Sequence, residues 1–341
     1  MQTTETIFSN SLISNFYNKH LEIRNRKNKN YFFNNNSSFA ENEYDNIICV
    51  NNINSHLYLN KLILKFNKNL KEQGKLFLSL QTLKDRKSII RRKLPVFISS
   101  LVLCLDFIFN RLLIKIPIVK YFCLWRHLYS NIIISQAEIL GRLVAHNFKI
   151  LETRSINDNL FVVCKKIKDC NKEVKINHGP LIKLKRIGKN GNTFKVYKLR
   201  TMHSYSQFLQ SYVYKLNSLE EGGKLKNDFR VSDVGRIFRK YWIDELPMLI
   251  NIIIGQMKLV GVRPLSQHYF NLYSEELKNK RIKFKPGFIP PFYVDLPKTF
   301  DEIMRSEKKY LELYEKNPLS TDLKYFFIAF YNVIFKGARS N

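Results

Sequence analysis

Apolar and polar positions along residues 44–81 follow a strand, helix, strand pattern. Residues 44–50 (YDNIICV) form a short apolar run typical of a buried strand, and residues 57–71 carry apolar positions at helical spacing. We expect Gly74 to end this helix and residues 75–81 (KLFLSLQ) to form the next strand. The pattern therefore predicts the beginning of an α/β unit.

A second periodic stretch begins at Ser135. Ser135 and Glu138 have the spacing of a capping box, which predicts a helix over 135–148. Residues 151–156 and 159–166 then read as two strands. Together with the first stretch, this order of elements resembles the second half of a class I methyltransferase over about 44–80 and 134–166. The glycine-rich loop that would hold its cofactor is missing before Tyr44, so we interpret this part as a structural remnant or a docking module.

An apolar run, LPVFISSLVLCL, occupies residues 94–105. It is too short to cross about 30 Å of hydrocarbon, and it fits a re-entrant or interfacial helix better. Basic residues on both sides indicate that both ends stay on the cytoplasmic face. We therefore expect a membrane-associated helix over about 94–118, and a buried core helix of a soluble domain is the alternative.

Composition adds a strong positive charge to this pattern. The 341 residues contain 57 Lys and Arg against 28 Asp and Glu, a formal charge of +29, which attracts nucleic acid, anionic lipid or phosphorylated substrates. The Asn-, Ser- and Lys-rich residues 1–43 are expected to be flexible. The five scattered cysteines and the lack of a signal-peptide pattern favour free thiols and a cytoplasmic catalytic part.

Features that suggest chemistry begin at Gly179. The turn at residues 189–192 (KNGN) lies between two apolar and basic runs and predicts a β-hairpin, because Asn-Gly accepts positive φ angles. Lys198 and Arg200 alternate on one face near its end, which makes them candidates for phosphate binding.

Two short helices are predicted next. Residues 234–242 carry Arg236 and Arg239 on an exposed face, and residues 242–255 hold Asp244 and Glu245 in the first turn of the second helix. A strand then leads to a turn at Arg263-Pro264.

Paired acids at a helix start have an ordinary role in capping, worth about 0.3–1 kcal/mol each. Among cations the same pair suits phosphoryl transfer: one carboxylate attacks phosphorus, the other holds Mg²⁺, and the cations neutralise a diphosphate.

Residues 179 to about 335 resemble the bacterial sugar transferase family, the polyprenyl-phosphate hexose-1-phosphate transferases. The motifs that carry the resemblance are YKLRTM, DFRVSDVGRIFRKYWIDELP and KLVGVRP. The resemblance implies a monotopic enzyme at the cytoplasmic face of the inner membrane. Such an enzyme takes a nucleotide-diphosphate sugar, here expected to be a UDP-sugar, and forms a covalent phosphosugar on an aspartate. The phosphosugar then passes to polyprenyl phosphate, which starts the assembly of a surface glycan or polysaccharide.

The resemblance also implies roles for single residues. Asp244 is the expected nucleophile and Glu245 the Mg²⁺ ligand, and phosphate contacts are expected from Lys198, Arg200, Arg236, Arg239 and Arg263. The sequence departs from the family pattern at Gln256, at Val262 and after Gly287, where FIPPFYVDLP reads as an irregular loop. These departures leave the donor sugar open.

The predicted architecture is α/β (α+β) in three parts. A flexible segment (1–43) precedes a methyltransferase-like mixed sheet with the apolar helix (44–170) and a compact α/β catalytic domain (171–341). The apolar tail after Asp322 predicts a helix that packs in the core or lies on a membrane surface. A basic nucleic-acid-binding protein and a catalytically inactive membrane adaptor are the alternatives, but no nucleic-acid-binding motif is present and we expect no nucleic-acid partner.

Overall fold

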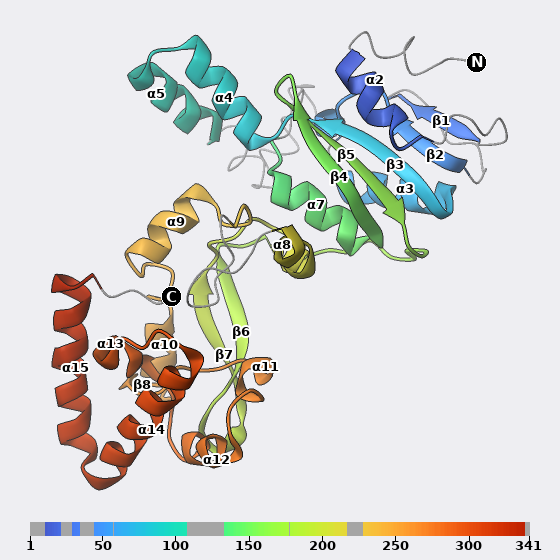
Figure 1. Ribbon diagram of the computed structural model, residues 1–341. Helices are drawn as coiled ribbons and strands as arrows, with labels where there is room; N and C mark the ends of the chain where they lie inside the picture. The colour runs from blue at the N-terminus through green and yellow to red at the C-terminus, as the bar shows by residue number, and fades with distance from the viewer. Residues whose placement is uncertain are drawn as a thin grey trace. The chain divides into compact units, whose positions relative to one another are not determined.

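The computed structural model describes residues 11–21, 29–34, 44–56, 58–107, 133–176, 178–216 and 228–337. The chain forms two compact units (Figure 1). The first comprises Met1–Asn177 and His203–Ser211, and the second comprises His178–Met202 and Tyr212–Asn341.

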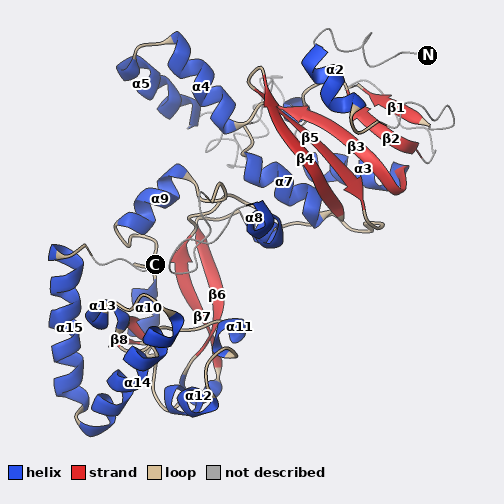
Figure 2. Cartoon of the chain, viewed as in Figure 1, coloured by secondary structure: helices blue, strands red, loops and turns tan. Residues whose placement is uncertain are grey.

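The first unit is built on a five-stranded sheet, drawn in red in Figure 2. Its strands lie in the order β1-β2-β3-β5-β4; β1, β2 and β3 are parallel, and β5 is antiparallel to both of its neighbours. The four predicted strands are confirmed, with shifted ends. The likeness to a methyltransferase stays a prediction. The strands are β1 (Asn30–Phe33), β2 (Tyr44–Cys49), β3 (Leu70–Leu80), β4 (Phe148–Ile156) and β5 (Asn159–Lys166).

Helices cover this sheet. The predicted helices are confirmed as α3 (Leu59–Asn69) and α7 (Gln136–Ala145), and the Ser135 hydroxyl caps α7 by accepting from the Glu138 N–H. Two elements, α2 (Ser11–Asn18) and β1, lie in the Asn-rich segment for which the sequence predicted none. Burial of Phe16 and Tyr17 against the sheet holds α2, a long-range contact that eight residues of local pattern do not reveal.

Gly74 does not end a helix, so this prediction is wrong. Helix α3 ends at Asn69, and Gly74 lies inside β3. A Cβ at Gly74 would come within 2.9 Å of the Lys71 carbonyl oxygen and 3.0 Å of the Asp45 carbonyl oxygen. The glycine is therefore explained by close approach of backbone beside an irregularity in the β2–β3 register.

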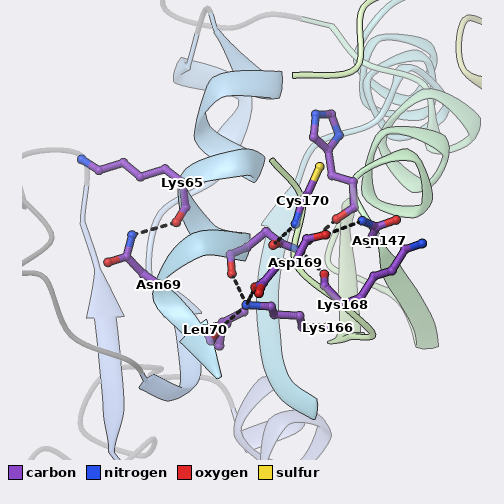
Figure 3. Close-up of polar contacts among 10 residues, drawn as sticks. Lys65, Asn69, Leu70, Asn147, Lys166, Lys168, Asp169 and Cys170 are labelled. Atoms are coloured by element: carbon purple, nitrogen blue, oxygen red, sulfur yellow. Dashed lines mark hydrogen bonds and ion pairs between the residues drawn. The ribbon is translucent and has the colours of Figure 1, made fainter. Parts of the chain in front are cut away.

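The ends of α3 and of β5 meet around the buried Lys166 (Figure 3). Its ammonium donates to the carbonyl oxygens of Asn67 (2.7 Å) and Leu70 (2.6 Å) and pairs with Asp169 (2.6 Å). The Asn67 amide donates to the His146 carbonyl oxygen and accepts from the Cys170 N–H. Two backbone carbonyls at the end of α3 and one carboxylate thus satisfy the three donors of the lysine.

The segment His203–Ser211 is part of the first unit, although second-unit residues flank it in the chain. Tyr205 is fully buried in a left-handed conformation (φ 64°), and its hydroxyl donates to the Val174 carbonyl oxygen. The Arg142 guanidinium lies 4.5 Å from the centre of its ring. A Cβ at Gly141 would overlap the Tyr205 backbone, so only glycine permits this packing.

Two further helices of the first unit, α4 (Leu83–Lys93) and α5 (Val96–Phe107), follow β3. An ion pair between Arg86 and Asp106 (2.5 Å) joins them. Helix α5 covers the first part of the predicted apolar helix, and residues 108–118 lie outside the described residues. Val96 and Phe97 are 83% and 86% exposed, so α5 is not the buried core helix of the alternative interpretation.

The second unit contains the β-hairpin and most of the remaining helices. The predicted hairpin is confirmed: Leu181–Ile187 pairs with Thr193–Leu199, and Asn190 and Gly191 adopt the positive φ angles of the turn. The elements are β6 (Leu181–Ile187), β7 (Thr193–Leu199), α8 (Gln210–Leu216), which begins in the first unit's segment, α9 (Asp233–Lys240), α10 (Met248–Ile253), β8 (Lys258–Val260), α11 (Gln267–Phe270), α12 (Glu275–Ile282), β9 (Gly287–Ile289), α13 (Phe292–Asp295), α14 (Phe300–Lys316) and α15 (Pro318–Phe335).

The proline-rich stretch after Lys285 is more regular than the predicted loop. Strand β9 pairs in parallel with β8, and the backbones of Gly261 and Gly287 lie so close that a Cβ on Gly287 would overlap Gly261. Helix α13 follows directly, because proline at a helix start loses no hydrogen bond.

The predicted tail helix is confirmed as α15. It buries Thr321, Tyr325, Ala329 and Asn332. The predicted core packing is thus confirmed for this face. The other face exposes Phe327, Tyr331 and Phe335, and the membrane-surface role of the tail stays a prediction. No helix in the described part of the chain is long and apolar enough to cross a membrane.

Candidate active site

The outer edge of β7 holds the segment that carries the acidic pair. The buried Asn251 of α10 accepts from the Tyr197 N–H (3.1 Å) and donates to the Lys195 carbonyl oxygen (2.8 Å). Two residues further along β7, the Leu199 N–H donates to the Asp244 carbonyl oxygen (2.8 Å). Backbone groups of Lys195, Tyr197 and Leu199, which alternate along this edge of β7, thus fix both α10 and the turn that contains Asp244.

Side-chain alternation along β7 then places Lys198. Val196 is fully buried and packs against Met248 and Met257. Because residues i and i+2 of a strand point to the same face, Lys198 extends this face beyond the apolar cluster. Its Nζ lies 2.5 Å from Oε1 of Glu245.

Asp244 and Glu245 do not lie in the first turn of a helix, which corrects the sequence prediction. Residues 241–247 form consecutive turns, and α10 begins only at Met248. A helix cannot start earlier for two reasons. The Asp244 carbonyl oxygen accepts from the Leu199 N–H of β7, and Trp242 has a φ of 58°, which is not helical. Helix capping therefore does not explain the acidic pair.

Helix α9 brings Arg239 to the same place. The Ser232 N–H and hydroxyl both donate to the Thr201 carbonyl oxygen just after β7, and a Cβ at Gly235 would overlap that oxygen. The helix therefore lies directly on the Thr201 backbone. From its second turn, Arg239 Nε donates to Thr201 Oγ1 (3.0 Å), and its charge acts on Asp244.

Glu245 is paired with two cations. Lys198 and, at 3.5 Å, Arg263 both approach its Oε1. Burial favours the neutral carboxyl, but the two positive charges outweigh burial and hold the pKa of Glu245 below its usual value. The pKa of Lys198 is lowered because burial outweighs the stabilising charges of Glu245 and Asp244.

Asp244 has the opposite environment. It forms no ion pair with any described residue, and its carboxylate accepts only from its own backbone N–H. Burial and the neighbouring charge of Glu245 raise the pKa of Asp244, and Lys198 and Arg239 only partly oppose them. Two adjacent carboxyls whose pKa values are pushed apart are typical of a divided chemical role.

The predicted phosphate-binding residues are only partly brought together. Lys198, Arg239 and Arg263 interact with the acidic pair. Arg200 Nε donates to the Gly179 carbonyl oxygen at the base of the hairpin, and Arg236 pairs on the exposed face of α9 with Asp233.

Sequence reasoning missed Arg186 and the support from Thr201. Burial and the nearby charge of Arg263 lower the pKa of Arg186, so its guanidinium lies near that of Arg263, which contacts Glu245. Such proximity of like charges favours an anion between them. In the sequence Arg186 is one of several basic residues of the hairpin, and no motif or spacing distinguishes it from the others.

The residues present fit a Mg²⁺ ion that is shared with a substrate. Mg²⁺ commonly takes one or two carboxylates together with phosphate oxygens. Both cations contact Oε1 of Glu245, and within the described ranges Oε2 has no hydrogen-bond partner. The same part of the chain contains no ready-made cluster of three or more acidic, histidine or cysteine side chains, so a metal here would depend on substrate oxygens.

The residues of this site lie within a match to a known protein family. The profile of the bacterial sugar transferase family matches residues 160–336, slightly more than half of the chain, and includes the acidic pair and its cations. The chain belongs to the bacterial sugar transferase family. Gln256, one of the positions where the sequence departs from the expected family pattern, accepts through Oε1 from the Asn251 amide.

Several curated proteins are similar to this sugar transferase. The galactosyl transferase CpsE of Streptococcus agalactiae is 31% identical over 144 residues, which is 41% of this chain and 32% of CpsE. The exopolysaccharide production protein ExoY of Sinorhizobium fredii is 44% identical over 108 residues, 30% of this chain and 47% of ExoY. An undecaprenyl-phosphate galactose phosphotransferase of Salmonella typhimurium is 36% identical over 107 residues, 30% of this chain and 22% of that protein. The chain thus spans half or less of the length of these relatives.

Proposed function

We propose that this sugar transferase moves a sugar 1-phosphate from a nucleotide-diphosphate sugar, expected to be a UDP-sugar, to polyprenyl phosphate. The curated names of its relatives support the type of reaction: one is a phosphotransferase that acts with undecaprenyl phosphate and galactose, and another with undecaprenyl phosphate and N-acetylgalactosamine. The observation that carries the proposal is the division between Asp244, which has no ion-pair partner among the described residues, and Glu245, which has two.

In the first step an Asp244 carboxylate oxygen attacks the phosphorus that bears the sugar. The bond from this phosphorus to the bridging oxygen breaks, and the nucleoside monophosphate leaves with the electron pair. In the second step a phosphate oxygen of the polyprenyl phosphate attacks the same phosphorus. The bond to Asp244 breaks, the carboxylate is restored, and a lipid-linked diphosphate sugar is formed.

The surrounding side chains suit this sequence. A carboxylate held by cations is a poor nucleophile, and Lys198 and Arg263 occupy Glu245 rather than Asp244. Arg186, Arg239 and Arg263 supply positive charge for a diphosphate that gains negative charge as the bond breaks. Glu245 would hold Mg²⁺ through Oε2, and the bound ion would offset the charge of the diphosphate.

The lipid acceptor requires contact with a membrane, and we place this contact on exposed apolar helix faces. In the second unit Ile253 of α10 and Phe335 of α15 are 83% and 72% exposed. In the first unit the exposed Val96 and Phe97 of α5 follow Arg91, Arg92 and Lys93 at the end of α4. Apolar side chains beside basic ones fit the surface of a bilayer with anionic headgroups, such as the cytoplasmic face of the inner membrane.

A panel of UDP-sugars tests the proposal. The protein is supplied with membranes that contain polyprenyl phosphate, and UMP release is measured for each sugar, with Asp244→Asn as the matched inactive control. We expect UMP release from at least one UDP-sugar with the unsubstituted protein and none with the variant. Equal release from both proteins, or from neither, would contradict the proposal.

A further inference from the structure

Arg263 is held in place by an ion pair buried behind it. The side chains of Arg281 on α12 and Glu307 on α14 form a direct ion pair and are 5% and 1% exposed. Nη2 of Arg281 also donates to the Arg263 carbonyl oxygen (2.6 Å), and its guanidinium lies 4.9 Å from the centre of the Tyr273 ring. The contacts of Arg281 therefore connect the packing of two helices to one backbone position of the active site.

The turn that contains Arg263 is fixed at three carbonyl oxygens. The Val262 carbonyl accepts from the Gly287 N–H (2.9 Å), and the Leu265 carbonyl accepts from the Ile187 N–H (3.0 Å). In both of these hydrogen bonds the donor is a backbone N–H group. Between them, the Arg263 carbonyl is held by the Arg281 side chain, so this part of the turn depends on the buried charge.

Stability alone does not account for a charge pair in this position. Removing two charges from water costs about as much as their attraction returns, and apolar side chains of similar size are often as stabilising. The ion pair instead fixes the Arg281 guanidinium where it can donate a hydrogen bond to the Arg263 carbonyl oxygen. A guanidinium has five N–H donors in a rigid fork, so Arg281 can pair with Glu307 and still hold the Arg263 carbonyl. Burial lowers the pKa of Arg281 to about 10, which leaves it charged at neutral pH.

We propose that Arg281, supported by Glu307, is a positioning residue that fixes the Arg263 backbone so that the Arg263 side chain reaches Glu245 and the substrate phosphates. The expected effect on the reaction rate rests on the proposed function. The expected effect on the Arg263 backbone rests only on the contacts of Arg281. A displacement of about 1 Å at a phosphate-binding residue is enough to cost on the order of 100-fold in rate.

The test is a double-mutant cycle with Arg263. The double variant Arg281→Met/Glu307→Leu replaces the ion pair by apolar side chains, and it is compared with Arg263→Ala and with the triple variant. We expect the double variant to lower kcat/KM for UMP release roughly tenfold or more. In the Arg263→Ala background the same two changes should have less than about a twofold further effect, because they act through Arg263.

A control variant separates positioning from helix packing. Lys280→Met breaks other ion pairs between α12 and α14, those of Lys280 with Glu312 and Glu315, but among the described contacts Lys280 donates to no residue of the active site. It should leave kcat/KM within about twofold of the unsubstituted protein. Arg281→Lys is the second test variant. It keeps the positive charge opposite Glu307 but loses the guanidinium that also donates to the Arg263 carbonyl, so kcat/KM for UMP release should fall as in the double variant.

Amide hydrogen exchange gives a readout that needs no activity. Peptides that contain the Ile187 and Gly287 amides, which donate to the Leu265 and Val262 carbonyls of this turn, should exchange faster in the double variant and in Arg281→Lys than in Lys280→Met. Faster exchange in a protein that turns over no UDP-sugar would support the positioning role and contradict the proposed function. Unchanged exchange, or full additivity with Arg263→Ala in an active enzyme, would overturn the positioning role alone.

Discussion

Lys198 and Glu245 form a close ion pair, with Nζ 2.5 Å from Oε1, beside Asp244, which has no such partner in the part of the chain that the structure describes. The two side chains are 17% and 13% exposed, so the pair is largely shielded from water. Since Lys198 pairs with Glu245 and not with Asp244, the pair itself gives the two carboxyls different environments. This separation is the physical basis for giving the two acids different roles.

Breaking this pair should cost both stability and activity. In Lys198→Met the Glu245 carboxylate keeps only its 3.5 Å contact with Arg263, and we expect a loss of about 3 kcal/mol in the free energy of unfolding. Replacing both residues by Met should recover most of this stability without recovering activity. Urea unfolding and UMP release measure the two effects, and Lys185→Met, which removes an exposed hairpin lysine, is the control. Full activity in the double variant would refute the need for the pair.

The pH dependence of the reaction should be bell-shaped. Asp244 must be ionised to attack phosphorus, and its pKa is raised, so activity falls as the pH drops through a value higher than that of an ordinary aspartate. Lys198 must be protonated to hold Glu245, and its pKa is lowered, so activity falls again as the pH rises through a value below that of an ordinary lysine. Initial rates of UMP release across pH test both limbs. An acid limb at or below the usual aspartate value would contradict the raised pKa.

The raised pKa of Asp244 also affects the stability of the folded protein. Because the pKa of Asp244 is higher in the folded chain than in the unfolded one, its ionised form opposes folding at neutral pH. Glu245 has the opposite sign: its contribution is present above its unfolded pKa and is lost as the pH falls through the lowered folded value. We therefore expect Asp244→Asn to melt at the same temperature as the unsubstituted protein or higher at pH 7. A clear fall in melting temperature would show that Asp244 is structurally required.

Gly235 should tolerate no side chain. A Cβ would overlap the Thr201 carbonyl oxygen, which also accepts from Ser232, so α9 must move away from β7 in Gly235→Ala. Overpacking of this kind costs about 1–3 kcal/mol. Arg239 moves with the helix, so the loss of activity should exceed what the loss of stability explains. Val234→Ala, which shortens an exposed neighbour on the same helix, is the matched control. Similar melting temperature and activity in the two variants would argue against this packing.

A chelator should stop the reaction, because Glu245 and the substrate phosphates are expected to share Mg²⁺. UMP release should disappear with excess EDTA and return when Mg²⁺ is added beyond the chelator. Glu245→Gln should need a higher Mg²⁺ concentration for half-maximal rate. Turnover that persists without any divalent metal would contradict this role of Glu245.

Local patterns in the sequence were sufficient for much of the fold. The Asn190-Gly191 turn and the Ser135 cap depend on neighbours in sequence, and both were predicted correctly. The helix α2 and the strand position of Gly74 depend on contacts with residues far along the chain. No periodicity within eight or ten residues contains this information, so these two features were missed.

The same distinction applies to the active site. Motifs identified Asp244, Glu245, Lys198 and Arg263, which the structure brings together. They did not separate Arg236, which pairs at the surface, from Arg239, which is directed inward by Thr201. The two arginines are three residues apart on one short helix, and only the packing of Gly235 on Thr201 decides which one faces the acids.

The most direct test of the central claim is covalent labelling of Asp244. The protein is mixed with a UDP-sugar that carries ³²P in the phosphate next to the sugar, without any lipid acceptor, and the label on the protein is measured after denaturation. We predict label on the peptide that contains Asp244, one UMP released per labelled chain, and no label in Asp244→Asn. Label of equal strength in the variant, or UMP release that requires the acceptor and leaves the protein unlabelled, would contradict an aspartyl-phosphosugar intermediate.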